Sequence, residues 1–121
     1  MKIYKNVWFE KFVSKQKIAN AALKKAIEDA EKGTIDADLG GNVIKQRIAR
    51  PKQGKSCGYR TIILFKKGEK AFFVYGFAKS DLDNIDESDV KDFKALSKEL
   101  FKLSDEEIEK AIKDKILTEV K

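Results

Sequence analysis

The chain has 121 residues but no histidine and a single cysteine, Cys57. One thiol cannot close an internal disulfide, and zinc frameworks built from cysteine and histidine need more ligands than this. The lack of histidine also excludes triads with a histidine base and nucleases that use paired imidazoles. Composition does not exclude a magnesium site made of carboxylates. The chemistry open to this chain is therefore mainly that of lysine, arginine and tyrosine, and we expect no metal and no cofactor.

Long apolar runs are also missing, because no stretch of about 18 apolar residues occurs and the first eight residues do not resemble a secretory signal. At 42% hydrophobic and 38% charged residues, the chain is too apolar to be disordered and too charged for a membrane span. We expect a soluble cytoplasmic protein. Its length fits one domain, residues 1–121, with one modest core.

Acidic residues are absent from one long internal segment. The thirty residues between Asp38 and Glu69 carry eight basic residues and no acid, although the formal net charge of the whole chain is only +6. The rest of the chain holds 18 basic residues against all 20 acids, a net charge of −2. The basicity is therefore local, and an acid-free block of this length within folded sequence indicates a site for a polyanion such as nucleic acid. The eight residues are Lys45, Arg47, Arg50, Lys52, Lys55, Arg60, Lys66 and Lys67.

The first third of the chain predicts one strand and two helices. Lys2 to Asn6 is a short strand candidate, and the aromatic residues that follow have helical spacing, which predicts a short helix whose aromatic face is core. From Ile18 to Lys32 the apolar residues follow the i, i+3, i+4 pattern, and Gly33 supplies a stop signal. Thr34 to Gly41 has the composition of a connecting loop.

Three strands are predicted in the middle of the chain, at Asn42 to Arg50, Tyr59 to Phe65 and Ala71 to Ala78. The first alternates Ile44 and Ile48 with Lys45 and Arg47, so one face is core and the other is cationic. A loop at Pro51–Gly58 is expected to join it to the second strand. Gly76 in the third strand indicates a bulge or a close backbone approach.

From Asp81 onward the chain holds 13 acids and 8 lysines and predicts two amphipathic helices, the second opened by a capping box at Ser104. This acidic part is better explained as solvated helix surface than as a metal site. The fold class is therefore α+β: an antiparallel sheet of three to four strands, two N-terminal helices packed on it, and one or two C-terminal helices.

The predicted basic hairpin brings Lys45, Arg47 and Arg60 together as a cradle for anions, which Arg50, Lys52 and Lys55 extend. RNA can be cut without a metal if its 2′-hydroxyl attacks the adjacent phosphate while other groups move the protons and cations stabilise the phosphorane. Lys52 and Lys55 are candidate bases, because surrounding cations lower the pKa of a lysine. Tyr75 and Lys79, near the end of the third strand, could also face the cradle, although Tyr75 is equally compatible with plain core.

Two motifs carry a family resemblance: G-K-S-C-G-Y-R at Gly54–Arg60 and F-F-V-Y-G-F-A-K at Phe72–Lys79. Together with D-A-D-L-G-G at Asp36–Gly41 and N-I-D at Asn84–Asp86, they resemble the RelE/HigB branch of bacterial toxin–antitoxin toxins. The resemblance implies a RelE-like domain that cleaves mRNA in the ribosomal A site without a metal. It also implies inhibition by a cognate antitoxin, commonly a helix-turn-helix protein, in a toxin–antitoxin hetero-oligomer.

The resemblance also implies residue roles. Arg60 would stabilise the transition state, Lys45 and Arg47 would hold the mRNA backbone, and Lys52 and Lys55 would contact substrate or ribosomal RNA. Lys79 matches a basic position after the last strand. The chain departs from the family in having neither a tyrosine after Tyr75 nor a histidine, so the acid and base stay open. Two alternatives also stay open: a ParE-like toxin that poisons gyrase without catalysis, and a nucleic-acid-binding module.

Overall fold

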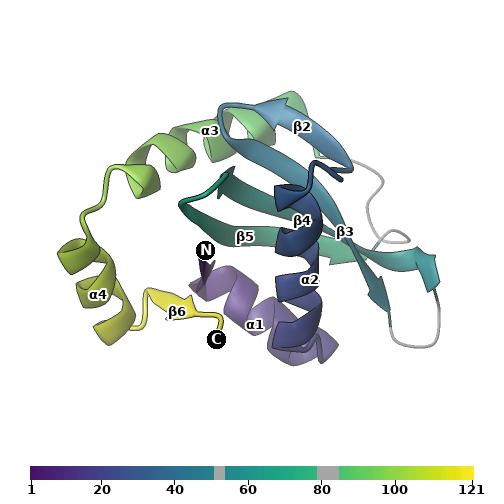
Figure 1. Ribbon diagram of the computed structural model, residues 1–121, viewed down its shortest axis with the longest axis horizontal. Coiled ribbons are helices and arrows are strands. Elements are labelled where there is room, and N and C mark those ends of the chain that lie inside the picture. Colours follow the sequence, from purple (N-terminus) through teal and green to yellow (C-terminus); the bar gives the residue numbers. More distant parts are fainter. Residues whose placement is uncertain (51–53, 79–84) are drawn as a thin grey trace.

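The computed structural model describes residues 1–50, 54–78 and 85–121, with the backbone alone at residues 50 and 54–57. The described residues form four helices and a six-stranded sheet (Figure 1). The helices are α1 (Val7–Gln16), α2 (Asn20–Glu31), α3 (Glu87–Phe101) and α4 (Asp105–Lys113). The strands are β1 (Lys2–Asn6), β2 (Ala37–Gly40), β3 (Val43–Arg50), β4 (Gly54–Lys66), β5 (Lys70–Ala78) and β6 (Leu117–Glu119).

The sheet is mixed, with the strand order β2-β3-β4-β5-β1-β6. Strands β2 to β5 form an antiparallel meander, β1 pairs in parallel with β5, and β6 pairs antiparallel with β1. The two ends of the chain therefore meet at one edge of the sheet, whereas β2 forms the other edge. Lys45, Arg47 and Arg60 of the basic segment lie on β3 and β4, and each of these strands has paired strands on both sides.

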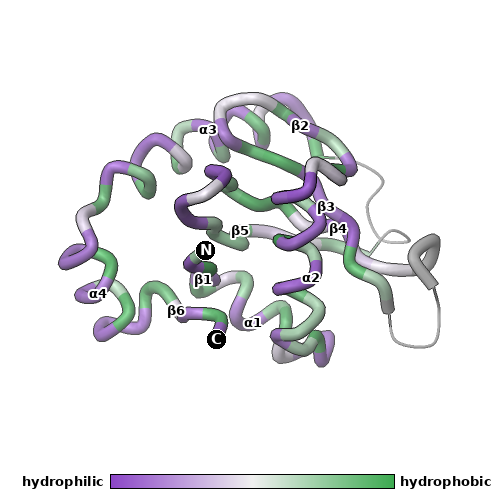
Figure 2. Tube along the Cα trace, viewed as in Figure 1, coloured by the Kyte–Doolittle hydropathy of each residue, from purple (hydrophilic) through white to green (hydrophobic). Residues whose placement is uncertain are grey.

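Each face of the sheet has its own hydrophobic cluster. On one face, Phe9 and Val13 of α1 and Leu23 and Ile27 of α2 pack with inward residues of the strands. On the opposite face, α3, α4 and β6 pack through a second cluster that includes Ile108. Figure 2 shows hydrophobic and hydrophilic segments alternating along α3 and α4, as expected for helices with one face against a sheet.

The helices begin where side chains cap them. The Asn6 side chain accepts a hydrogen bond of 2.8 Å from the Phe9 amide, which opens α1 directly after β1. Capping boxes open α3 at Asp86 and α4 at Ser104, and the second of these was predicted from the sequence. These caps explain why short, highly charged segments form helices with defined starts.

Several predictions are confirmed and others are wrong. The strand at Lys2–Asn6, both N-terminal helices and both C-terminal helices are confirmed. The antiparallel sheet of three to four strands is wrong in two respects. It has six strands, because β2, in the predicted loop, pairs with β3, and β6 pairs with β1. It is also mixed, because β1 pairs in parallel with β5. The predicted loop at Pro51–Gly58 is wrong from Gly54 onward, where β4 begins. Of the two alternatives at Gly76, the close approach is confirmed, because a Cβ atom there would overlap the Phe12 ring. The bulge is not at Gly76, which pairs in register with Thr61; the register of β4 and β5 shifts two residues before it.

Candidate functional site

Two rows of side chains cross the strands β3, β4 and β5 on one face of the sheet. In the first row Arg47 is paired with Arg60, which is paired with Phe77. In the second row Lys45 is paired with Ile62, which is paired with Tyr75. Directly paired residues project from the same face. The structure therefore brings together three predicted cations and the predicted tyrosine, on the face opposite to α1 and α2.

The carboxylate of Asp36 lies between the two arginines. Its Oδ1 accepts a hydrogen bond of 3.0 Å from Arg47 Nε, and its Oδ2 lies 3.7 Å from Arg60 Nε. The longer distance is an ion pair and exceeds hydrogen-bonding range. The Asp36 side chain is 15% exposed, Arg60 is 9% exposed and Arg47 is 49% exposed. Arg47 is thus the accessible member of the pair, and Arg60 lies beneath it.

Arg60 retains unused donor capacity. Its Nη1 atom is buried and has no hydrogen-bond acceptor among the described residues. Buried donors are nearly always paired in folded proteins, so this unpaired donor calls for an explanation, such as a ligand that is bound in function. The half-exposed guanidinium of Arg47 is suited to a phosphate oxygen, and the buried guanidinium of Arg60 beside it adds a second positive charge.

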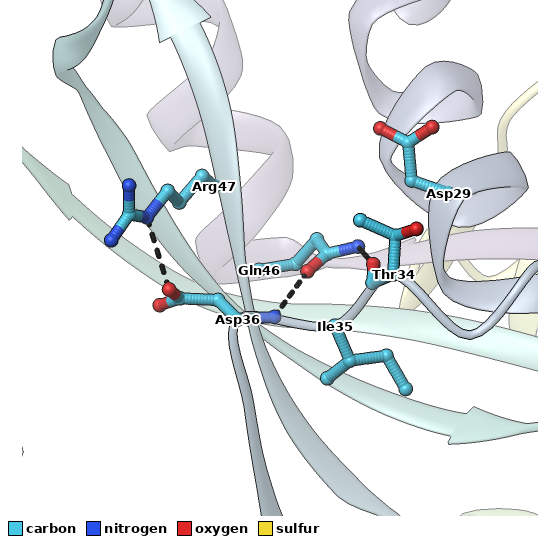
Figure 3. Close-up of a pocket in the computed structure, with 6 residues that line it drawn as sticks. All are labelled: Asp29, Thr34, Ile35, Asp36, Gln46 and Arg47. Atoms are coloured by element: carbon cyan, nitrogen blue, oxygen red, sulfur yellow. Dashed lines mark hydrogen bonds and ion pairs between the residues drawn. The ribbon is translucent and has the colours of Figure 1, made fainter.

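Gln46 holds the backbone that carries Asp36. Its side-chain oxygen accepts a 3.0 Å hydrogen bond from the Asp36 amide, while its side-chain nitrogen donates to the carbonyls of Ala26 at 3.0 Å and Thr34 at 2.9 Å. Thr34, Asp36 and Gln46 line a pocket of about 240 Å³. Figure 3 shows Arg47 reaching Asp36 from β3. Gln46 itself is buried. The position of the Asp36 carboxylate is therefore fixed from β3 and α2.

The three residues G-Y-R at the end of the first motif each have a different structural role. Gly58 lies so close to β3 that a Cβ atom there would overlap the Ile48 carbonyl oxygen. Tyr59 points to the helical face, where its hydroxyl donates a 3.0 Å hydrogen bond to Gln16 on α1. Arg60 points to the opposite face. The motif thus sets the approach of two strands, anchors one of them to α1 and presents an arginine.

Tyr75 is half-buried among aromatic rings. The ring centroid of Trp8 lies 4.5 Å from that of Tyr75, and those of Phe93 and Phe77 lie 6.0 and 6.2 Å away. Trp8 itself is 43% exposed, so the prediction that this tryptophan belongs to the core is wrong. It is the second residue of α1, just beyond β1, and β1 pairs with only the first part of β5, so Trp8 lies where β5 has no partner on that side. Tyr75 therefore lies at the β5 end of the second row. Among the described residues, no hydrogen bond joins it to Arg47 or Arg60.

The side chains of the remaining predicted site residues lie outside the described part of the structure. Lys52 and Lys79 are not described, and for Arg50 and Lys55 only the backbone is. In the described residues, no cluster of acidic, cysteine or histidine side chains could hold a metal ion. None of the described helices is both long and apolar enough to cross a membrane.

Comparison with known protein families agrees with this geometry. The family model for the RelE toxin of the RelE/RelB toxin–antitoxin system matches residues 1–120. The chain belongs to the RelE toxin family. Membership implies an antitoxin of the RelB type as partner. A search of curated proteins finds no match. The resemblance that the motifs indicated is thus confirmed over nearly the full length of the chain.

Sequence reasoning missed two polar residues in this RelE family site, Asp36 and Gln46. A partial signal was present, because Asp36 and Asp38 both stand shortly before the acid-free segment, but the sequence does not say which of the two meets the arginines. Its role depends on β2 folding back on β3, where Ala37 pairs with Lys45. Gln46 alternates with Lys45 and Arg47 along β3 and so points away from them, toward α2.

Proposed function

We propose that this RelE family protein is the toxin of a toxin–antitoxin module and a metal-independent endoribonuclease. It cleaves mRNA on the ribosome in the cytoplasm and thereby inhibits translation and arrests growth. The observation that carries the proposal is the directly paired Arg47 and Arg60, with a buried and unpartnered Nη1 on Arg60. A gyrase poison that performs no phosphate chemistry has no need of such a pair.

The proposed reaction begins with attack of the RNA 2′-oxygen on the adjacent phosphorus. The bond from phosphorus to the 5′-oxygen then breaks, so the products carry a 2′,3′-cyclic phosphate and a 5′-hydroxyl. Negative charge develops on the non-bridging oxygens, where Arg47 offers the more accessible guanidinium and Arg60 would donate from its unpartnered Nη1 atom, which is covered in the free protein and would have to be uncovered when RNA binds. Preorganised donors of this kind stabilise the transition state more than the ground state.

The proton transfers have several candidates. Lys52 and Lys55 belong to the basic segment, and Tyr75 lies on the same sheet face as the arginines, two strands from Lys45. Lys45, Arg50 and Lys79 would bind the RNA backbone on either side of the scissile phosphate. A site that relies on positioning and charge fits a reaction in which the ribosome orients the message.

The proposal is tested by expressing the wild-type chain from a tight promoter beside Arg60→Ala. Lys67→Ala serves as the control, because Lys67 is an exposed basic residue at the turn between β4 and β5. The 5′ ends of translated and untranslated messages are then mapped by primer extension. We expect codon-phased cuts that require translation, that vanish in Arg60→Ala and that persist in Lys67→Ala.

Other results favour the alternatives. Growth arrest with intact mRNA and DNA breaks would replace the proposal with a ParE-like gyrase poison. Normal growth with RNA binding in vitro would leave a nucleic-acid-binding module. For the antitoxin, we propose a small helix-turn-helix protein encoded beside this gene. Its co-expression is expected to restore growth and to remove the mapped cuts.

A further inference from the structure

Asp36 is an unexpected residue in a site that attracts phosphate. It places a negative charge within a cationic face, although a carboxylate repels the phosphate that the site is proposed to bind. Its two oxygens face two different arginines, at 3.0 Å from Arg47 Nε and 3.7 Å from Arg60 Nε. One carboxylate therefore interacts with both arginines at the same time.

The arginine pair needs such a counter-charge. Arg47 and Arg60 are directly opposite on adjacent strands, where like charges destabilise the pairing. A carboxylate between them offsets the repulsion and so keeps both guanidiniums close together. Asp36 faces each arginine at Nε and so leaves the terminal nitrogens to other acceptors, and the buried Nη1 of Arg60 has no acceptor among the described residues.

The carboxylate is itself held in place. The amide of Asp36 donates to the side chain of Gln46, which is tied to the carbonyls of Ala26 and Thr34 (Figure 3). A residue whose only task was to solubilise the sheet edge would not need this support. Asp38, two residues along, shows the contrast: it is exposed, and its side chain accepts a local 2.9 Å hydrogen bond from Gly40.

We propose that Asp36 is a positioning residue, fixed by Gln46, that holds Arg47 and Arg60 by their Nε atoms and orients their terminal nitrogens toward one RNA phosphate. The inference rests on the proposed function for its consequence in catalysis. The arrangement itself can be tested without RNA. Asp36 does not contact the substrate; it acts through the two arginines.

The first test is the side-chain Nε–H spectrum of the ¹⁵N-labelled full chain. The sequence contains only three arginines, Arg47, Arg50 and Arg60, so three signals are expected, and Arg→Lys variants assign them. In Asp36→Asn, the Arg47 and Arg60 signals are expected to shift and their protons to exchange faster with water. In Asp38→Asn, which removes the same charge nearby, both signals are expected to stay in place.

The second test is the cleavage kinetics of programmed ribosomes. Displacement of a reacting group by about 1 Å can cost about 10²-fold in rate. Asp36→Asn is therefore expected to lower kcat about 10²-fold with KM changed less than about threefold, while Asp38→Asn leaves kcat unchanged. A loss of fold alone would lower the active fraction, which circular dichroism of the same samples detects.

Two outcomes would overturn the inference. If Asp36→Asn lowers KM and raises the rate, the carboxylate competes with phosphate instead of positioning the arginines. If the Arg47 and Arg60 signals do not change, Asp36 does not hold them. A wild-type chain that cleaves no message refutes the proposed function, and the spectra then decide alone whether Asp36 holds the pair.

Discussion

Replacement of Gln46 by leucine tests how strongly the buried amide supports the site. Leucine has a similar size but removes three hydrogen bonds, to the Asp36 amide and to the carbonyls of Ala26 and Thr34. Each such bond contributes about 1 kcal/mol, and leaving its buried partner unpaired costs up to about 3 kcal/mol. The apolar side chain regains part of this loss. We therefore expect Gln46→Leu to lower the free energy of unfolding by about 3 kcal/mol.

Urea unfolding followed by circular dichroism measures this loss, and thermal melts give a second estimate. For a chain of this size, 1 kcal/mol corresponds to about 4 °C, so the melting temperature is expected to fall by about 12 °C. Gln16→Leu is the matched control, since Gln16 is half-buried and accepts one hydrogen bond, from Tyr59. It is expected to cost about 1 kcal/mol. Equal losses of unfolding free energy in the two variants would show that the three hydrogen bonds of Gln46 support the fold no more than the single bond of Gln16 does.

Two further predictions concern the sheet. Gly58→Ala is expected to lower the free energy of unfolding by about 2 kcal/mol or more, because the new methyl group overlaps the backbone of β3 at Ile48. Urea unfolding measures this loss, and an unchanged unfolding midpoint would contradict the close approach of the two strands. Burial and the nearby Glu119 raise the pKa of Tyr4, so its neutral form stabilises the fold below about pH 10 and this contribution is lost as the pH rises further. The stability of Tyr4→Phe is therefore expected to fall less steeply above pH 10 than that of the wild type, and parallel curves would refute this.

Local patterns predicted much of the fold. The alternation of Ile44 and Ile48 with Lys45 and Arg47 predicted a strand with one buried and one cationic face, and β3 has these faces. Helical periodicity predicted α2 within two residues of each end. These elements were predictable because each one carries its own hydrophobic pattern, which decides what it buries.

The features that were not predicted are those whose formation depends on a partner strand. The glycines of Asp36–Gly41 read as a turn, yet Ala37–Gly40 becomes β2 because β3 offers it an open edge. The three residues of β6 are too few to show a pattern, and β1 supplies their hydrogen-bonding partners. Parallel pairing of β1 with β5 has no local signature at all.

The cationic residues of the candidate site were predicted, but the contacts that position them were not. Arg60 and Arg47 were identified from charge and motif, and their direct pairing across β3 and β4 follows from the register. The counter-charge of Asp36 could not be predicted, because it depends on β2 and on the buried Gln46 together. Asp36 and Asp38 both stand shortly before the basic segment, and it is the fold that brings Asp36, not Asp38, to the arginines.

The central claim, that Arg60 stabilises the transition state of mRNA cleavage, is tested most directly with purified components. Ribosomes carrying a defined message with an open A site are mixed with excess wild-type chain, Arg60→Ala or Lys67→Ala, and the single-turnover rate and the fragment ends are measured. We expect a downstream fragment with a 5′-hydroxyl, formed equally by wild type and Lys67→Ala and at least about 10²-fold more slowly by Arg60→Ala. Equal rates for wild type and Arg60→Ala would contradict it.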